Sequence, residues 1–325
     1  MKAIQIPAYG APDVIQLRDV AAPTPKANEV LVKVVATSVN FSTGLLVTGQ
    51  PFLGRLMVGG PTTPKIKTPG NDLAGRVIAV GSAVTRFRLG DAVFGDLAGH
   101  GYGTYAELVA VPESALTLKP AKLSFEEAAA APEAGLVALQ ALRDLGGLQA
   151  GEHVLIVGAS GGIGTFAVQL AKYFGAEVTA VVSPRNIDLV RTLGADHVID
   201  YTREDFARNG QQYDLILSTA GYRSLADYKR ALKPGGRYVT TGGSLKQVFA
   251  ALLFGALVGG GHKMAALNVK PNKDLDYLGS LMESGAVRVV IDRCYPLSQS
   301  AEAIRYYLTG KTRGKIIIQV APEGA

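Results

Sequence analysis

Hydrophobic and polar residues alternate in short runs over the first third of the chain, and clusters of Gly, Pro, Asn and Asp separate these runs. Alternation with a period of two is typical of β-strands, and such clusters are typical of the turns between them. The sequence therefore predicts a β-rich first domain. Its strands are expected at residues 2–6, 29–36, 72–80 and 105–111.

The pattern becomes helical between Leu123 and Leu148, in a stretch rich in Ala and Leu. Ser124 precedes Glu127 by three residues, which is the spacing of a capping box at a helix start. From His153 onward, apolar runs of strand length alternate with helical segments, and this alternation predicts βαβ units in a parallel, doubly wound sheet. Strands are expected at 153–157, 177–182, 197–200, 215–218 and 237–241, and helices at 164–174 and 185–193.

The last part of the chain predicts helices near 274–284 and 300–308 and a strand at 315–320, which we expect to rejoin the first domain. The fold class is therefore α/β, with a β-rich domain interrupted by a doubly wound dinucleotide-binding domain. The β-rich domain is expected to comprise residues 1–122 and 267–325, and the doubly wound domain residues 123–266.

Composition narrows the classes of function. With 48% hydrophobic residues among 325, the chain has enough apolar material for folded domains and is not a disordered protein. Its 33 basic and 27 acidic residues give a formal charge of +6 without a basic run. This pattern suits an anionic small ligand better than nucleic acid, so we expect no nucleic-acid partner.

The number of cysteines and the length of the apolar runs indicate where in the cell the protein is located. Cys294 is the single cysteine, so no intrachain disulfide and no cysteine-built zinc or iron–sulfur site can form. The longest apolar run, residues 248–261, is shorter than the roughly 20 residues that span a bilayer. The first residues have neither signal-peptide nor transit-peptide composition. We expect a cytoplasmic protein with no transmembrane segment.

A glycine-rich segment gives the most specific chemical signal. A buried strand runs into Gly158, and a helix begins near Gly164. This strand–turn–helix context is the one that a dinucleotide fingerprint requires, because backbone N–H groups at the helix start can bind a pyrophosphate. A tightly packed turn without a ligand is the alternative. The residues expected to bind the coenzyme here are Ala159, Ser160, Gly161, Gly162 and Ile163.

The end of the second strand of this domain indicates which coenzyme is bound. An NAD-preferring site places an acidic residue there, about 20 residues past the last glycine, to bind the adenosine ribose. This chain has Ser183 and Arg185 at that point. A hydroxyl and a cation favour the 2′-phosphate of NADP, so NADPH is the expected coenzyme. The alternative for Arg185 is a solvated residue at a helix start.

Five motifs in order resemble the medium-chain dehydrogenase/reductase superfamily, and more narrowly its zinc-independent quinone oxidoreductase branch. The motifs are Thr37-Ser-Val-Asn40, Pro69-Gly-Asn-Asp-Leu-Ala-Gly75, Gly103-Thr-Tyr-Ala-Glu107, Gly161-Gly-Ile-Gly164 and Leu193-Gly-Ala-Asp-His-Val-Ile-Asp-Tyr201. The resemblance covers nearly the whole chain. It implies a GroES-like β-rich domain and a Rossmann domain, with coenzyme and substrate in the cleft between them.

The resemblance also implies roles for four residues. Asn40 lies where family members contact nicotinamide or a substrate oxygen, with a loop-capping asparagine as the alternative. Ser42 lies where zinc-dependent relatives have a proton-relay hydroxyl, and Gly242 lies near the expected nicotinamide site. Tyr201 resembles the tyrosine near the adenosine 2′-phosphate, with an ordinary strand-end tyrosine as the alternative. The expected catalytic residues are therefore Asn40 and Ser42, and Asn40, Tyr201 and Gly242 join the coenzyme site.

The same resemblance argues against a metal. Zinc alcohol dehydrogenases of the superfamily bind catalytic zinc with a cysteine and a histidine, and the matching positions here are Asn40 and Asn71. Both ligands are missing, and the four histidines lie far apart along the chain, so we expect no metal. Without a Lewis acid, hydride transfer to a quinone or an activated C=C bond is easier than carbonyl–alcohol interconversion, because hydrogen-bond donors can stabilise the delocalised charge on oxygen.

The expected function is therefore NADPH-dependent reduction of a quinone or an α,β-unsaturated carbonyl compound. Two alternatives stay open: a zinc-independent alcohol dehydrogenase or carbonyl reductase, and a protein that binds NADPH without catalysis. The apolar run at 248–261 predicts either a wall for a small hydrophobic substrate or a subunit contact. Together with the family resemblance, it predicts a homodimer.

Overall fold

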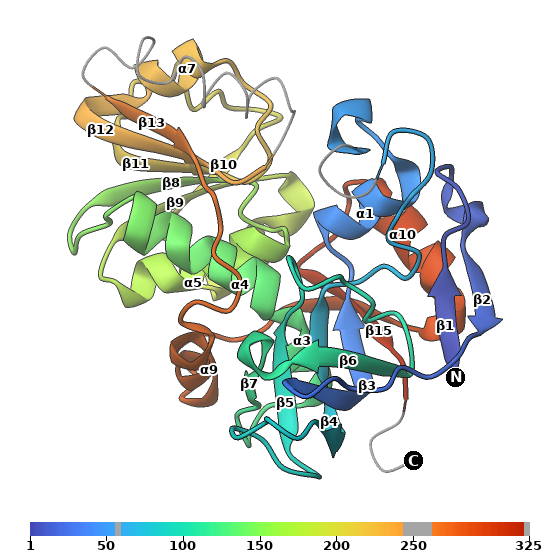
Figure 1. Cartoon of the computed structure of the whole chain (residues 1–325). Helices are drawn as coiled ribbons and strands as arrows, with labels where there is room; N and C mark the ends of the chain where they lie inside the picture. The colour runs from blue at the N-terminus through green and yellow to red at the C-terminus, as the bar shows by residue number, and fades with distance from the viewer. Residues whose placement is uncertain (56–59, 243–261, 322–325) are drawn as a thin grey trace. The chain divides into compact units, whose positions relative to one another are not determined.

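The computed structural model describes residues 1–55, 60–242 and 262–321, and contacts within the chain divide it into two compact units (Figure 1). Unit 1 comprises Met1–Leu136, Lys270–Ser284 and Ile291–Ala325, and unit 2 comprises Val137–Val269 and Gly285–Val290. The sequence instead predicts the first boundary after residue 122. Helix α3 (Phe125–Ala130) lies in unit 1 because it packs against the central strands of that unit's sheet.

Unit 1 is built on two β-sheets. A two-stranded sheet pairs β1 (Lys2–Gln5) with β2 (Gln16–Asp19), and the larger sheet has the order β14-β15-β3-β4-β5-β7, with β6 paired to β3. The bounds of the larger sheet's strands are β3 Glu29–Ser38, β4 Asp72–Val80, β5 Ala92–Asp96, β6 Leu108–Pro112, β7 Thr117–Leu118, β14 Ile291–Pro296 and β15 Lys315–Gln319. Strand β15 pairs with β3, which confirms that the end of the chain rejoins the first domain.

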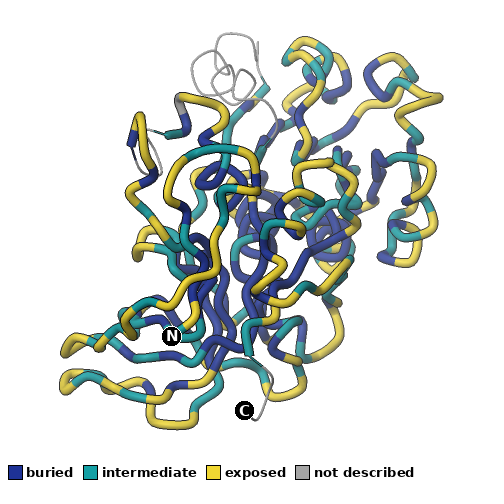
Figure 2. Tube along the Cα trace, turned by 90° about the vertical axis from the view of Figure 1, so that its right-hand side faces the viewer, coloured by how far each residue is buried: buried dark blue, intermediate teal, exposed yellow. Residues whose placement is uncertain are grey.

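In the first domain, the alternation of hydrophobic and polar residues arises where one face of a strand is buried. On β3, Val30, Val32 and Val34 are fully buried, whereas Leu31 and Lys33 between them keep accessible surface. One face of the strand therefore packs into a core that includes Leu73 of β4 and Val93 of β5. Figure 2 shows the same contrast along the chain, with buried segments in the sheets and exposed ones in the turns.

The helical stretch after residue 123 forms three segments instead of one helix. The capping box at Ser124 is confirmed: the Glu127 N–H donates to Ser124 Oγ over 3.1 Å, and the Ser124 N–H donates to Glu127 Oε2 over 2.9 Å. Pro132 lacks an N–H group and so cannot continue α3. The chain proceeds through α4 (Pro132–Leu139) and a π-helical segment, Gln140–Leu145. In the described part of unit 1, the other α-helices are α1 (Phe41–Thr48), α9 (Leu275–Glu283) and α10 (Ser300–Leu308).

Unit 2 contains the predicted doubly wound sheet. Its six strands are all parallel, in the order β10-β9-β8-β11-β12-β13. The bounds are β8 His153–Val157, β9 Glu177–Val182, β10 His197–Asp200, β11 Tyr213–Ser218, β12 Leu232–Thr240 and β13 Lys263–Ala266, and those of the helices are α5 Gly162–Tyr173, α6 Ile187–Thr192 and α7 Leu225–Arg230. The strand order reverses between β8 and β11, and ligands of such sheets bind at the carboxyl edge at this point.

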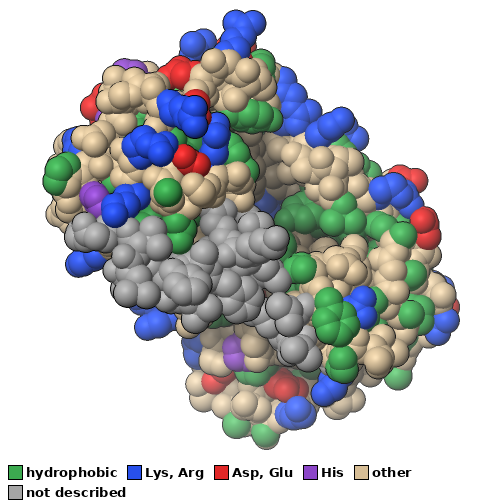
Figure 3. Space-filling model, turned by 90° about the horizontal axis from the view of Figure 1, so that it is seen from above, with side chains coloured by type: hydrophobic (Ala, Val, Ile, Leu, Met, Phe, Trp, Pro, Cys, Tyr) green, Lys and Arg blue, Asp and Glu red, His purple; other side chains and the backbone are tan. Residues whose placement is uncertain are grey.

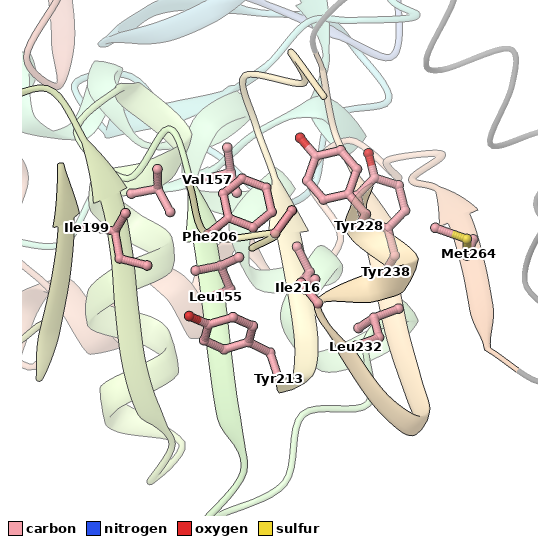
Figure 4. Close-up of a cluster of buried hydrophobic side chains, with 13 residues drawn as sticks. Leu155, Val157, Ile199, Phe206, Tyr213, Ile216, Tyr228, Leu232, Tyr238 and Met264 are labelled. Carbon is pink, nitrogen blue, oxygen red and sulfur yellow. The ribbon is translucent and has the colours of Figure 1, made fainter. Parts of the chain in front are cut away.

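Helices α5 and α7 lie on opposite faces of this sheet (Figure 1), as right-handed crossovers require. The core on the α7 side combines Leu155 and Ile216 from central strands with Tyr228 from α7 (Figure 4). The rings of Tyr228 and Tyr238 lie 4.6 Å apart between centroids, and Phe206 stacks on Tyr228 at 5.6 Å. This large aromatic content makes the sheet a rigid platform for the loops at its carboxyl edge.

Two expectations from the sequence concern the apolar run at 248–261 and the absence of a transmembrane segment. The apolar run at 248–261 lies outside the described residues, so its predicted role stays a prediction. Among the described residues, no helix has the length and apolar character needed to cross a membrane. Lys and Arg side chains are spread over the face shown in Figure 3 in small groups, with acidic side chains between them.

Candidate active site

The glycine-rich turn has the predicted strand–turn–helix geometry in unit 2. Strand β8 runs into Gly158, and the 12-residue helix α5 begins at Gly162, with Gly161 as its N-cap. The first N–H groups of a helix have no intrahelical carbonyl partner, and the helix dipole favours an anion beside them. The turn therefore presents unused backbone donors at the carboxyl edge of the sheet, where a pyrophosphate group can bind.

The glycines of this turn have different reasons to lack a side chain. Gly158 has φ +84°, and a Cβ there would lie 2.5 Å from Thr219 Oγ1. A Cβ on Gly164 would lie 2.2 Å from the carbonyl oxygen of Gly158, so both residues are required by packing. A Cβ on Gly161 would meet nothing nearer than that same oxygen at 3.6 Å. The open space at Gly161 fits a ligand that approaches the backbone closely.

A second part of the coenzyme site lies where β9 ends. Asn186 donates through Nδ2 to Ser160 Oγ over 2.8 Å and to Ser183 Oγ over 3.2 Å, so it ties the glycine-rich turn to the end of β9. Its Oδ1 is buried and accepts no hydrogen bond from the described residues. A buried acceptor without a protein partner fits a hydroxyl donor such as an adenosine ribose.

The remaining residues predicted at the coenzyme lie around the same edge. Tyr201 is about half exposed, and its N–H donates to the carbonyl of Val182, the residue before Ser183, over 3.3 Å. Arg185 is exposed, one residue before Asn186. Gly242 follows β12, and its carbonyl accepts a 2.9 Å hydrogen bond from Thr240 Oγ1. Of the turn residues, Ala159 is buried and Ser160, Gly161, Gly162 and Ile163 are half-buried.

The predicted catalytic residues lie in unit 1, in a polar network where β3 and β5 end and β4 and β15 begin. The register of the sheet sets Asp72 directly opposite Asp96. Like charges in that position are destabilising, and the network contains the groups that offset them. Lys315, which is 3% exposed, donates through Nζ to Asn40 Oδ1 and, over 3.3 Å, to Asp72 Oδ2.

The ammonium group of Lys315 fixes the orientation of two amides in series. It has only donors, so Asn40 turns Oδ1 toward it and directs Nδ2 to Asp72 Oδ2 over 2.8 Å and to Asn71 Oδ1 over 3.2 Å. Asn71 then directs its own Nδ2 to Asp96 Oδ1 and to Glu133 Oε2, each over 2.8 Å. Both hydrogens of each amide are therefore used inside unit 1.

Ser42 and Glu133 are the members of this network that keep more than a trace of accessible surface. Ser42, in the first turn of α1, has Oγ 3.0 Å from Asn71 Oδ1 and 3.4 Å from Glu133 Oε2. Glu133 belongs to the first turn of α4, and its N–H donates to Asp72 Oδ1 over 2.8 Å. A molecule that reaches this network therefore meets Ser42 and Glu133 first.

Burial changes the protonation of two carboxyl groups in the network. Removal from water raises the pKa of Asp96 to about 6, and the charge of Asp72 adds to the effect. Removal from water also raises the pKa of Glu133 to about 8, and Asp72 and Asp96 act in the same direction while Lys315 and Asn71 oppose them. Burial therefore favours the protonated form of both carboxyl groups, and that of Glu133 more strongly.

Comparisons with known proteins decide the family. Residues 26–121 match the alcohol dehydrogenase GroES-like domain, and residues 193–318 match the zinc-binding dehydrogenase family. The chloroplast envelope quinone oxidoreductase homolog of Arabidopsis thaliana is 34% identical, with 98% of each chain covered. The NADPH-dependent alkenal/one oxidoreductase of the same plant is 33% identical, with 99% of this chain and 80% of that protein covered. The solved quinone oxidoreductase from Coxiella burnetii has a TM-score of 0.89 at 32% identity, with 99% of both chains covered.

The chain belongs to the medium-chain dehydrogenase/reductase superfamily. It is an oxidoreductase of the quinone oxidoreductase-like branch, and the predicted GroES-like and Rossmann domains are confirmed. Its relatives include enzymes named for quinones and for alkenals and enones.

Some members of the superfamily bind catalytic zinc at the positions that Asn40 and Asn71 occupy here. The side chains at these positions do not fit a zinc ion. Asn71 uses its two hydrogens and accepts at Oδ1 from Asn40 and Ser42, so its amide is saturated by protein partners. Amides are poor zinc ligands compared with thiolate and imidazole. Across residues 1–55, 60–242 and 262–321, no group of three or more His, Cys, Asp or Glu side chains could hold a metal ion.

Two of the four histidines, His153 and His197, lie near each other in the structure although they are far apart in the sequence. The rings of His153 and His197 lie 6.0 Å apart between centroids, because β8 and β10 flank β9. His153 Nε2 contacts Thr179 Oγ1 at 2.7 Å, and His197 Nε2 contacts Glu177 Oε1 at 2.8 Å. Each ring therefore has a hydrogen-bond partner on the intervening strand.

Sequence reasoning for this superfamily member missed Lys315, Glu133, Asp96 and Asn186. A lysine at the head of the apolar strand 315–320 was a signal of a buried ion pair, because buried lysines need a partner. The Pro132-Glu133 pair at a helix start was a weaker signal. Asp96 belongs to β5, a strand that the alternating pattern did not predict, and Asn186 has no recognisable motif.

Proposed function

We propose that this protein is an NADPH-dependent reductase of quinones or α,β-unsaturated carbonyl compounds that works without zinc. One observation carries the proposal: neutral amides stand at positions 40 and 71, and the accessible Ser42 hydroxyl beside them lies 3.4 Å from Glu133 Oε2, a carboxyl group whose pKa is raised by burial. Such a group can protonate a developing oxyanion but cannot polarise a carbonyl as a metal ion does. The names of the relatives support the same substrate classes.

The proposed division of roles follows the two units. Bound NADPH supplies a hydride. In unit 2, the open turn at Gly161 and the N–H groups at the start of α5 are proposed to bind the pyrophosphate, and Gly242 to lie beside the nicotinamide. In unit 1, Ser42 gives a proton to the enolate or quinol oxygen. Asn40 acts chiefly by orienting Asn71, and its Oδ1 keeps one lone pair that it can offer to the nicotinamide amide.

The preference for NADPH over NADH is part of the proposal. Ser183 lies at the end of β9 and is hydrogen-bonded to Asn186, with the Arg185 cation and the Tyr201 hydroxyl following nearby along the chain. No carboxylate replaces Ser183 to repel a 2′-phosphate. A phosphate group there would accept charge-assisted hydrogen bonds, which are about twice as strong as neutral ones.

The test of the proposed function is the rate of NADPH oxidation with a panel of enones, quinones, aldehydes and secondary alcohols. Turnover of enones or quinones with little turnover of aldehydes is the expected result. Preference for aldehydes and alcohols would favour a zinc-independent alcohol dehydrogenase. Tight NADPH binding without turnover of any compound would favour a binding protein.

Zinc removal gives a separate prediction. Purified protein is expected to contain less than stoichiometric zinc, and overnight treatment with EDTA should leave turnover unchanged, because Asn40 and Asn71 offer no thiolate or imidazole. Elemental analysis and the NADPH assay measure the two effects. One tightly bound zinc ion per chain, with activity lost on its removal, would contradict the prediction.

We also propose a homodimer that acts in the cytoplasm. The family resemblance and the apolar run at 248–261 support the dimer, because an apolar segment of that length is a candidate for burial against a second subunit. Sedimentation of the purified chain at micromolar concentration should give twice the chain mass of 34.0 kDa. A monomer mass under those conditions would exclude a stable dimer.

A further inference from the structure

The contacts of Ser42 leave one hydrogen unaccounted for. A serine hydroxyl has a single hydrogen, and Ser42 Oγ lies 3.0 Å from Asn71 Oδ1 and 3.4 Å from Glu133 Oε2. Asn71 Oδ1 is an acceptor, because Asn71 Nδ2 is directed to two carboxyl groups. The Ser42 hydrogen therefore belongs to the shorter contact. Ser42 Oγ then keeps its lone pairs free on the side of Glu133 Oε2, 3.4 Å away, where a protonated carboxyl group can donate to it.

The charges around Glu133 favour this neutral form. Asp72 at the start of β4 and Asp96 at the end of β5 disfavour a charge on Glu133, and the Lys315 ammonium on β15 acts against them. The phenols of Tyr102 and Tyr307 also face it: burial raises the pKa of Tyr102 to about 12 and raises that of Tyr307, and the Glu133 charge adds to both shifts. When Glu133 is neutral, the single ammonium group of Lys315 is shared by the carboxylates of Asp72 and Asp96. When Glu133 is ionised, three carboxylates share it.

We propose that Glu133 is the proton reservoir of the reaction and recharges the Ser42 hydroxyl. This inference rests on the proposed function. When hydride from the coenzyme reaches the substrate, the Ser42 O–H bond breaks, and the proton forms a new O–H bond with the enolate or quinol oxygen. The Glu133 Oε2–H bond then breaks and its proton forms a new O–H bond at Ser42 Oγ. A proton from water restores Glu133, so the net step consumes one hydride and one proton.

Lys315 and the two amides keep this pair in line. The ammonium group holds Asn40, Asn40 holds Asn71, and Asn71 holds Glu133 Oε2 through Nδ2 and Ser42 Oγ through Oδ1. Each orientation depends on the one before it. Lys315 and Asn71 are therefore positioning residues, and Ser42 is the group that meets the substrate.

The test is Glu133→Gln, because glutamine has the shape and neutrality of the protonated acid but carries no acidic proton. Turnover of an enone or a quinone at pH 7 should fall about 100-fold, since general acid catalysis contributes about 10²–10⁴-fold. The dissociation constant of NADPH, measured by fluorescence, should stay unchanged. Glu126→Gln is the matched control: Glu126 lies on α3 and contacts Gln319, outside the network, so its variant should keep full turnover.

The pH profile separates a proton reservoir from a structural role. Wild-type kcat should fall as pH rises above about 8, because Glu133 then loses the proton that it must supply. Glu133→Gln should lack this descending limb. A variant with wild-type turnover and an unchanged limb would overturn the inference.

An infrared measurement tests the stored proton without coenzyme or substrate. At pH 7 the wild-type protein should show the C=O stretch of a neutral carboxylic acid that is missing in Glu133→Gln, and this band should disappear as pH rises past about 8. Identical bands in the two proteins would overturn the inference. An inactive wild type would defeat the proposed function, whereas an active wild type with an unimpaired Glu133→Gln would defeat this inference alone.

Ser42→Ala covers the case in which Glu133→Gln does not fold. Ser42 is partly exposed in the first turn of α1, so truncating it to Ala should leave the fold intact. This variant keeps the acid but removes the hydroxyl, so it should lose a similar factor in turnover and retain the infrared band. Full turnover in Ser42→Ala would overturn the inference as well.

Discussion

Replacing Lys315 by Met is expected to lower the free energy of unfolding by about 3–5 kcal/mol, which is the usual cost of removing one partner of a buried ion pair. The Lys315 side chain is 4% exposed and that of Asp72 is fully buried, so water cannot take the place of the ammonium group. The substitution also leaves Asn40 Oδ1 without its donor. Methionine fills a similar volume, so the loss measures the missing charge and not a cavity.

Two comparisons show whether charge is the cause. Lys315→Met combined with Asp72→Asn removes both charges and should lose less stability than the sum of the single variants, as coupled residues do. Lys233→Met breaks an exposed pair with Asp214, 2.8 Å apart, and should cost no more than about 1 kcal/mol. Urea unfolding monitored by circular dichroism measures the wild type, the two single variants at positions 315 and 72, their combination and Lys233→Met. A loss below about 1 kcal/mol in Lys315→Met would contradict the predicted role.

The loss in Lys315→Met should also depend on pH. Burial raises the pKa of Asp96 and of Glu133 above their usual values, so the native state binds protons that the unfolded chain releases. Stability linked to such groups increases as pH falls. Without the ammonium group this dependence strengthens, and the loss should be smaller at about pH 5 than at about pH 8.

Arg185→Ala is expected to weaken NADPH binding by about ten- to a hundredfold and to change NADH binding little. A charge-assisted hydrogen bond to the 2′-phosphate contributes about 1.5–3 kcal/mol, and NADH has no phosphate there. Arg185 is exposed beside Ser183 and Asn186, at the end of β9, where a bound ribose would lie. The dissociation constants of both coenzymes, measured by calorimetry, give the selectivity directly.

Two further variants support this comparison. Arg191→Ala removes an exposed arginine of α6 that pairs with Asp188 at 3.8 Å, and it should leave both dissociation constants unchanged. Ser183→Asp should add repulsion and shift the preference toward NADH. An Arg185→Ala effect of equal size on both coenzymes would show that this residue does not contact the 2′-phosphate.

The coenzyme domain could be predicted closely because its signals are local. The strand at 153–157, the turn at Gly158 and the helix that follows are contiguous, and Gly164 is required by its contact with the Gly158 carbonyl six positions earlier. The alternation of strands and helices then specifies a parallel sheet. Asn186, the residue next to Arg185, was the part of this region that no motif indicated.

The network around Ser42 could be predicted only in part because its contacts are distant in sequence. Asn40 and Ser42 were expected from family motifs, but Lys315 lies 275 positions from Asn40 and Glu133 lies 91 positions from Ser42. The pairing of β15 with β3 brings Lys315 to Asn40, and the hydrogen bond from the Glu133 N–H to Asp72 Oδ1 holds the start of α4 at the same place. Residue types alone do not reveal such a convergence, because each of these side chains is also common on a protein surface.

In the proposed reaction, hydride reaches an activated double bond without help from a metal. The most direct test is a reaction of EDTA-treated protein with an α,β-unsaturated ketone and NADPH deuterated at its transferable position, followed by nuclear magnetic resonance of the product. We predict a saturated ketone with deuterium on the β-carbon and an intact carbonyl group. Deuterium on the carbinol carbon of an alcohol, or no reduction of either this ketone or a quinone, would contradict the account.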